Sequence, residues 1–244
     1  MRLTGKVALV TGGSRGIGLA VAQAFGREGA RVVVVGRDET ALGEAVRTPG
    51  LTGTSALAIP ADISDPAAVA ALAVRVQREV GALHVLVNNA SILGPRVPVA
   101  AYPIEAWQEV LAVNLTGVFL VIRALLPLME RSGGGSIINV SSGVGRTGKG
   151  RWGAYAVSKF GLEGLTQVLA DECQGTGIRV NAVNPGGTRT AMRATAYPQE
   201  DPNTLLRPEE ITPVFVYLAS DESRTVTGQS LDARDYMGRS ALSH

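Results

Sequence analysis

Short apolar runs alternate along the chain with longer stretches whose apolar positions recur at helical spacing. The runs are rich in valine and isoleucine and apolar throughout, which is typical of strands buried on both faces of a sheet. The predicted strands are KVALVT, RVVVVG, ALAIPA, HVLVNN, SIINVS, IRVNAV and, more weakly, QSLDAR. The stretches between them predict helices at roughly residues 16–28, 39–47, 66–80, 104–131, 153–175 and 208–219.

Strands that alternate with helices predict right-handed βαβ units and a Rossmann-type, doubly wound parallel sheet of about seven strands, with helices on both faces. The sequence contains no linker, low-complexity segment or repeat, so residues 1–244 are expected to form one domain. Ligands of such sheets bind at the carboxyl ends of the strands. Two polar loops leave strands at that edge and are candidates for the substrate site: GVGRTGKGRWG from Gly143, and a short lid at about residues 191–207.

Composition narrows the class of protein. The formal net charge is +2, too small to indicate a nucleic-acid partner. A single cysteine, Cys173, excludes an intrachain disulfide, and His84 and His244 are too isolated to predict a metal site. No leader-like segment is visible, and the longest apolar run, VFLVIRALLPLM, contains Arg123 and Pro127 and looks too short to span a bilayer. We expect a cytoplasmic protein that is not embedded in a membrane.

The first predicted strand runs directly into a glycine-rich turn, TGGSRGIG, which also opens the first helix. Gly12, Gly16 and Gly18 would allow a tight turn and the close approach of a pyrophosphate, held by the amides of the helix N-terminus. The spacing is not the generic G-x-G-x-x-G pattern. A turn with a purely structural role is the alternative.

The end of the second strand indicates which dinucleotide is bound. An acidic residue there would bind the ribose 2′-hydroxyl of NAD, but the chain has Gly36 and then Arg37, and the acids that follow more plausibly start a helix. Arg37 and Arg15 could neutralise a 2′-phosphate, which favours NADP(H). The alternative is that both are solvated surface arginines.

Tyr155 and Lys159 lie four residues apart in a helical pattern, so they share a helix face. Taken alone, they could be an ordinary surface pair. Ser142 precedes Tyr155 by thirteen residues, just after a strand. A lysine ammonium, with the positive charge of an oxidised nicotinamide, is expected to lower the pKa of the phenol, so that Tyr155 can serve as acid and base. The Ser142 hydroxyl could hold a carbonyl oxygen near it.

These pieces together resemble the short-chain dehydrogenase/reductase family, broadly its 3-oxoacyl-thioester reductases. The resemblance spans the chain to about residue 232 and rests on the order and spacing of TGGSRGIG, ADIS, NNAS, Asn114, Ser142, YAVSK and NPGGTRT. It implies a catalytic set of Asn114, Ser142, Tyr155 and Lys159. Asn114 would kink its helix and hold a water that relays protons from Lys159, although it could also be a satisfied buried amide.

The resemblance also implies a set of cofactor contacts. Asp62 would contact the adenine, the backbone of Asn88–Ala90 would lie under the adenosine ribose, and Thr190 would contact the nicotinamide carboxamide or a phosphate. Asn88 and Asn89 could instead be plain turn residues. The full set of expected NADP(H) contacts is Gly12, Ser14, Arg15, Gly16, Ile17, Gly18, Arg37, Asp62, Ile63, Asn89, Ala90, Tyr155, Lys159, Pro185, Gly186, Thr188 and Thr190.

The chain departs from the family pattern in three places. The C-terminal stretch LDARDYMGRSALSH replaces a valine-aspartate-glycine-glycine motif, which puts the usual tetramer contact in doubt. Thr188 stands where an aliphatic residue is usual, and the lid is short. Three segments near the expected site, SILGPRVPV, GVGRTGKGRWG and GGTRTAMRATAYP, contain basic but no acidic residues, which suggests an anionic substrate, with chance as the alternative. Those basic residues are Arg96, Arg146, Lys149, Arg151, Arg189 and Arg193.

Assembly and activity are also predicted. The stretch VNLTGVFLVIRALLPLM is apolar almost all round a helix, and the helix with Tyr155 carries small residues, so these helices are expected to pair in a homodimer or homotetramer. The leading activity is NADP(H)-dependent reduction of a small-molecule carbonyl, specifically an anionic or carrier-linked 3-oxoacyl thioester. The alternatives are a reductase of free ketones or quinones, and a non-catalytic NADP(H)-binding regulator.

Overall fold

The computed structural model describes residues 1–238. It contains a parallel sheet of seven strands in the order β3-β2-β1-β4-β5-β6-β7, the doubly wound arrangement predicted from the alternating pattern. After β1, the next two strands are added toward one side of it and the last four toward the other, so the strand order reverses between β1 and β4, which pair directly. The strands are β1 Val7–Thr11, β2 Arg31–Gly36, β3 Leu57–Pro60, β4 Val85–Asn88, β5 Gly135–Val140, β6 Ile178–Asn184 and β7 Ser230–Asp232.

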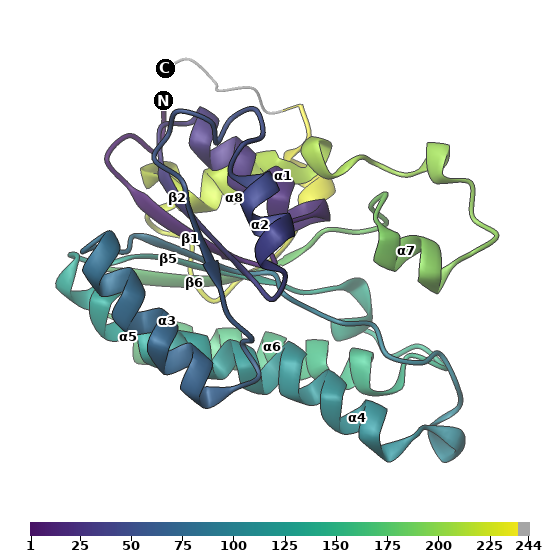
Figure 1. Ribbon diagram of the computed structural model, residues 1–244. Coiled ribbons are helices and arrows are strands. Elements are labelled where there is room, and N and C mark those ends of the chain that lie inside the picture. Colours follow the sequence, from purple (N-terminus) through teal and green to yellow (C-terminus); the bar gives the residue numbers. More distant parts are fainter. Residues whose placement is uncertain (239–244) are drawn as a thin grey trace.

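Helices cover both faces of the sheet (Figure 1). One layer holds α1, α2 and α8, and the other holds α3, α5 and α6, each packed on its own apolar cluster of buried residues. Asp38 and Asp65 start α2 and α3 by accepting backbone N–H bonds, as N-cap residues do. The helices are α1 Gly16–Arg27, α2 Glu39–Ala45, α3 Pro66–Glu79, α4 Ile104–Leu111, α5 Gly117–Arg131, α6 Gly153–Glu172, α7 Ala191–Ala196 and α8 Thr212–Ala219.

The predicted helix at 104–131 is one helical run, but its middle is a π-helical turn, Ala112–Thr116, that contains Asn114. The run Ile104–Arg131 has 28 residues and is long and apolar enough to cross a membrane, a length that the shorter apolar run in the sequence did not indicate. In the most apolar 18-residue window of this run, 44% is buried inside the protein. It packs along α3 and α6, which explains much of its apolar character.

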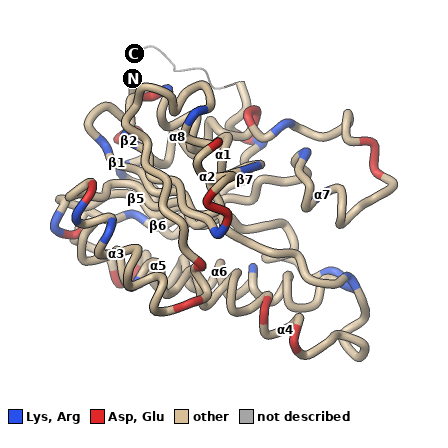
Figure 2. Tube along the Cα trace, viewed as in Figure 1, with Lys and Arg blue, Asp and Glu red and all other residues tan. Residues whose placement is uncertain are grey.

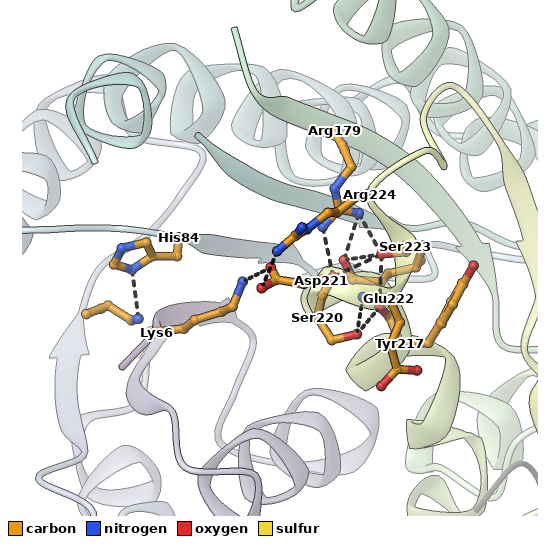
Figure 3. Close-up of polar contacts among 11 residues, drawn as sticks. Lys6, His84, Arg179, Tyr217, Ser220, Asp221, Glu222, Ser223 and Arg224 are labelled. Carbon is orange, nitrogen blue, oxygen red and sulfur yellow. Dashed lines mark hydrogen bonds and ion pairs between the residues drawn. The ribbon is translucent and has the colours of Figure 1, made fainter. Parts of the chain in front are cut away.

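The amino edge, where the strands begin, gathers charged side chains around a cavity of about 760 Å³ (Figure 3). Arg179 donates to the carbonyls of Leu218 (3.1 Å) and Ser220 (3.2 Å), so it caps the end of α8. Asp221 accepts from Lys6 at 2.8 Å and from Arg224 at 3.1 Å. Cations at helix C-termini offset the negative end of the dipole, so this cluster has a structural explanation.

Candidate active site

Thr11, the last residue of β1, ties the glycine turn to the loop after β4. Its hydroxyl accepts from the amides of Asn89 (3.0 Å) and Ala90 (3.1 Å). Asn89 Nδ2 donates back to the carbonyls of Thr11 (3.0 Å) and Gly12 (3.1 Å). The two carboxyl-edge loops therefore form one rigid unit. Thr11 was not among the residues predicted from the sequence. A polar residue at the end of an otherwise apolar strand is the feature that could have indicated it.

The glycine turn leaves space in front of α1. Gly12 and Gly16 have φ values of 63° and 56°, the left-handed region that favours glycine. A Cβ on Gly18 would lie 2.2 Å from the Gly12 carbonyl oxygen, whereas one on Gly16 would meet only Thr190, at 3.7 Å. Arg15 precedes α1 in an extended conformation, with no side-chain cap from the described residues. Backbone amides at this helix start therefore face a gap opposite Thr190, which fits a phosphate group.

Arg37 and Asp62 lie beside each other at the ends of β2 and β3. Arg37 Nη1 is 4.0 Å from the Asp62 carboxylate, and its side chain is 62% exposed, so it can turn toward a ligand. Asp62 accepts from both the amide (2.9 Å) and the hydroxyl (2.7 Å) of Ser64. These bonds, with the Arg37 charge, hold the pKa of the Asp62 carboxyl below its ordinary value. Both side chains lie just beyond the carboxyl ends of their strands, the edge at which ligands of such sheets bind.

Three further residues predicted to contact the cofactor, Ser14, Ile17 and Ile63, lie in or beside these loops. Ser14 Oγ would lie 3.9 Å from a Cβ on Gly36, which places it at the end of β2. The side chain of Ile63 is buried in the core between the sheet and α3, so only its backbone can face a ligand. Ile17 packs partly buried against the opposite core.

Ser142, Tyr155 and Lys159 converge between the end of β5 and the first turns of α6. Lys159 is 3% exposed, and its Nζ donates to the Val140 carbonyl at 2.7 Å. The same Nζ lies 5.6 Å from the Tyr155 ring centre. Ser142 follows the strand in an extended conformation, and its hydroxyl faces the phenol. The spacing of Tyr155 and Lys159 predicted their shared helix face, and the structure also brings Ser142 beside them, as the family resemblance implied.

Burial dominates the protonation of this group. It raises the pKa of Tyr155 to about 12, although the hydroxyls of Ser142 and Ser91 oppose the rise. It lowers the pKa of Lys159 to about 8, although the charge of Glu163 opposes the fall. In the chain by itself the pKa of Tyr155 is therefore raised, because desolvation of the buried phenolate outweighs the hydrogen bonds from Ser142 and Ser91; the expected lowering also invoked the charge of an oxidised nicotinamide and stays a prediction. Ser91 is a neighbour of the phenol that the sequence analysis did not select.

Asn114 uses its whole amide within the protein. It accepts from the amide of Ile92 at 2.8 Å and donates to that residue's carbonyl at 2.9 Å and toward Ser158 Oγ at 3.2 Å. It is fully buried. These bonds tie the π-helical turn to the loop after β4, which carries Ser91, and the relay of protons from Lys159 past Asn114 stays a prediction. Asn88 similarly donates to Asn139 at 2.9 Å, inside the core.

The segment after β6 positions Thr188 and Thr190. Thr188 is 3% exposed, forms an isolated parallel bridge with Leu206, and donates to the Pro185 carbonyl at 3.1 Å. Gly186, which lies between Pro185 and Thr188, makes the turn with a φ of 69°. The Thr190 hydroxyl accepts from the amide of Arg193 at 3.1 Å, so it caps α7. The predicted lid therefore contains a short helix, and only part of Thr190 is left to contact a ligand.

An aromatic clasp joins the lid to the catalytic helix. Arg96 lies between the rings of Trp152 and Tyr197, 4.6 Å from each ring centre, and donates to the Ala196 carbonyl. The Trp152 ring centre lies 5.5 Å from that of Tyr155. Three segments thus meet beside the phenol: the loop after β4, the start of α6 and the end of α7. Tyr197 was not singled out from the sequence, because its partners lie far away in the chain.

The basic residues of the loops are only partly available to a ligand. Arg193 pairs with Glu200 at 2.6 Å, and Arg146 pairs with Asp232 at 2.7 Å. Both acids lie outside the loop sequences in which no acid was found. Within residues 1–238, Lys149, Arg151 and Arg189 have no carboxylate at salt-bridge distance. The expectation of a cationic mouth of six basic residues was therefore too large, and Figure 2 shows charges of both signs around α7.

Comparison with known proteins is consistent with this geometry. The family model described as short chain dehydrogenase matches residues 6–201. A solved structure described as a short chain dehydrogenase from Pseudomonas syringae has a TM-score of 0.92 and 47% identity, covering 95% of this chain and 96% of its own. A second, from Shigella flexneri and complexed with NADP, has a TM-score of 0.90 and 40% identity, covering 96% and 98%.

Curated relatives differ in what they act on. An oxidoreductase from Escherichia coli is 42% identical over 95% of this chain and 93% of its own length. The 3-alpha-(or 20-beta)-hydroxysteroid dehydrogenase of Mycobacterium tuberculosis is 42% identical, over 93% and 87%. The 3-oxoacyl-[acyl-carrier-protein] reductase of Thermotoga maritima is 39% identical, over 94% and 96%.

Proposed function

The chain belongs to the short-chain dehydrogenase family, and on that premise we propose that it is an NADP(H)-dependent reductase of a carbonyl compound, or oxidant of the corresponding alcohol. The observation that carries the proposal is the pair of buried side chains Tyr155 and Lys159, with the half-buried Ser142 beside them, at the carboxyl edge of the sheet. A regulator that only bound the cofactor would gain nothing from burying a lysine and a phenol side by side.

Each residue of this group has a role that follows from its environment. When bound, the nicotinamide supplies or accepts the hydride. Ser142 donates a hydrogen bond to the substrate oxygen and holds it beside the phenol. With a pKa of about 12, Tyr155 is protonated at neutral pH and so is ready to give its proton to a forming alkoxide, which is a stronger base. The Lys159 ammonium then stabilises the phenolate that is left.

The cofactor is proposed to be NADP(H). The exposed Arg37 stands at the end of β2, where the ribose 2′-position of a dinucleotide is read. Asp62, the nearest carboxylate, is occupied by Ser64 and by Arg37 itself. The Shigella flexneri neighbour with NADP supports the same choice.

The substrate is proposed to be a 3-oxoacyl thioester, and a free cyclic or polycyclic ketone is the second candidate. Likeness to the Thermotoga maritima reductase supports the first, and likeness to the hydroxysteroid dehydrogenase supports the second. The unpaired Lys149, Arg151 and Arg189 favour the first, because a carrier-linked or coenzyme-linked thioester is anionic.

A homodimer is proposed for the assembly. The exposed face of α6 presents Val157, Phe160 and Val168, each 45–56% exposed, and Phe119 on α5 is 46% exposed. A Cβ on Gly164 would meet nothing, so this face of α6 is open to a close neighbour. Pairing of α5 and α6 with their copies would cover these side chains. Light scattering that gives the mass of a monomer at micromolar concentration would exclude this assembly.

The test of the function is initial rates with NADPH and NADH on a short 3-oxoacyl thioester and on a panel of free ketones. We expect turnover that prefers NADPH, and a loss of about a thousandfold or more in Tyr155→Phe. Ser132→Ala, far from the site, is the matched control that removes one hydroxyl. No turnover of any substrate by protein that binds NADPH would instead favour the non-catalytic regulator.

A further inference from the structure

Glu163 is a buried carboxylate that the proposed reaction does not use. It lies on α6 one turn after Lys159, on the same face of the helix, and is 8% exposed. Burying a carboxylate is costly unless hydrogen bonds and opposite charges compensate. The groups that compensate Glu163 come from three different segments of the chain, and two of those segments build the active site.

The first contact is with the catalytic loop. Ser141 Oγ donates to Glu163 Oε1 in a short, fully buried hydrogen bond. Ser141 is the residue directly before Ser142, so anchoring the one restrains the backbone that aims the other. The carboxylate thus connects the strand end that carries Ser142 with the helix that carries Tyr155 and Lys159.

The second contact is with the last strand. Ser230 of β7 also donates to Glu163 Oε1, at 2.8 Å. Arg146 Nε lies 3.9 Å from the same oxygen and donates to Ser230 Oγ at 3.0 Å, and its Nη1 pairs with Asp232 at 2.7 Å. Asn184, at the end of β6, donates to Asp232.

The charges around Lys159 balance only when Glu163 is included. Lys159 and Arg146 supply two positive charges, and Glu163 and Asp232 supply two negative ones. The other groups that face Lys159 are neutral: the Tyr155 ring and the Val140 carbonyl. Glu163 is therefore the carboxylate one turn from Lys159 on its own helix, whereas Asp232 is paired with Arg146.

We propose that Glu163 is a positioning residue: its carboxylate keeps the buried Lys159 protonated at the working pH, and its bond to Ser141 fixes Ser142. This inference rests on the proposed function, since it assigns a role within that reaction. The cluster of Glu163, Ser141, Ser230, Arg146 and Asp232 further makes β7 a structural part of the catalytic site, although β7 lies at the edge of the sheet.

The test separates charge from structure. Glu163→Gln keeps an oxygen that can accept from both serines but removes the negative charge, and Arg146→Gln removes the nearby positive charge. Glu172→Gln is the control, an exposed carboxylate at the far end of the same helix. The Lys159 pKa is measured directly by NMR titration of cofactor-free protein labelled with [ε-¹³C]lysine, with Lys159→Met assigning the signal.

We expect Glu163→Gln to lower the Lys159 pKa by roughly half to one unit, and Arg146→Gln to raise it by less. The alkaline limb of the pH–rate profile should move in the same two directions, while Glu172→Gln leaves both measurements unchanged. An unchanged Lys159 pKa in folded Glu163→Gln, or shifts of the same sign in both variants, would overturn the inference. Because the titration needs no turnover, a failure of the proposed function would be visible separately, as an inactive wild type.

Discussion

Charged or ionisable side chains gather at both edges of the sheet, but their bonding partners and their burial differ. At the amino edge, Arg179 is bonded to helix-end carbonyls and Asp221 to two cations (Figure 3). At the carboxyl edge, Lys159 is buried with one carbonyl acceptor, and burial raises the pKa of Tyr155. Within residues 1–238, buried polar side-chain atoms without a partner occur at both edges, on Arg96 and Trp152 near the phenol and on Arg2 and Ser136 near the starts of β1 and β5.

This contrast indicates that the groups at the carboxyl edge contribute less to the stability of the native state than those at the amino edge. Charges at the amino edge have their partners already in place, and these hydrogen bonds and ion pairs offset the burial that lowers the pKa of Arg179. Groups at the carboxyl edge are held in forms that water would not favour, and perturbed groups of this kind are characteristic of functional sites. Removing a charge should therefore have opposite effects on stability at the two edges.

Lys159→Met gives the largest expected effect. Activity should fall by about a hundredfold or more, since the phenolate loses its stabilising charge. At pH 7 the variant should nevertheless be more stable by roughly 1 kcal/mol, because the desolvation of the Lys159 ammonium outweighs its attraction to Glu163, and that carboxylate keeps its bonds from Ser141 and Ser230. Native Lys159 has a pKa of about 8 against 10.5 for the ordinary group, so wild-type stability rises with pH between these values.

This pH dependence supplies the measurement. Urea denaturation of wild type and Lys159→Met at pH 7 and at pH 10 should show the advantage of the variant shrinking at the higher pH. A variant that is less stable than wild type at pH 7 would contradict the idea that the carboxyl edge is strained.

Arg179→Met is the matching change at the amino edge, with the opposite expected sign. The guanidinium donates to Leu218, Ser220 and, at 2.7 Å, Ser223. Its loss should lower the free energy of unfolding by about 2–3 kcal/mol, since several carbonyls at the end of α8 lose their donor. Rates per folded molecule should stay at the wild-type value. A drop in kcat would show that the two edges are coupled.

Arg37→Ala sharpens the view of the carboxyl edge as a ligand site. The arginine is exposed, so stability should change by less than about 0.5 kcal/mol. The preference for NADPH over NADH in kcat/KM should fall by about 10- to 100-fold, the value of a charge-assisted contact to a phosphate. Arg47→Ala, an arginine beyond the end of α2, is the control. If the preference persisted, Arg37 would be a solvated surface residue.

Arg96→Gln should give the smallest effect. It removes the cation from between Trp152 and Tyr197, which loosens α7. We expect KM for the carbonyl substrate to rise about threefold to tenfold with little change in kcat, as for a stacking contact worth about 1 kcal/mol. Amide hydrogen exchange of residues 191–197 should become faster. Unchanged exchange would mean that Thr190 and the Arg193–Glu200 pair hold the lid without the clasp.

Patterns in the sequence were enough to predict the order of strands and helices and most of the candidate site. Apolar strands alternating with helical stretches leave one common architecture, and the motifs of the site are local: a glycine turn, a strand-end arginine, and a tyrosine and a lysine one helical turn apart. Spacing alone placed Tyr155 and Lys159 on one helix face, whereas their selection with Ser142 as the predicted catalytic group rested on the resemblance of the whole set of motifs to the family.

How these groups are charged, and which residues hold them, became visible only in the folded chain. Burial sets the pKa of Tyr155 and Lys159, and burial depends on elements that meet only after folding. The same holds for Glu163, bound by Ser141 and Ser230, which lie 22 and 67 residues away. Desolvation and hydrogen bonding act through space, so no local pattern in the sequence could have contained them.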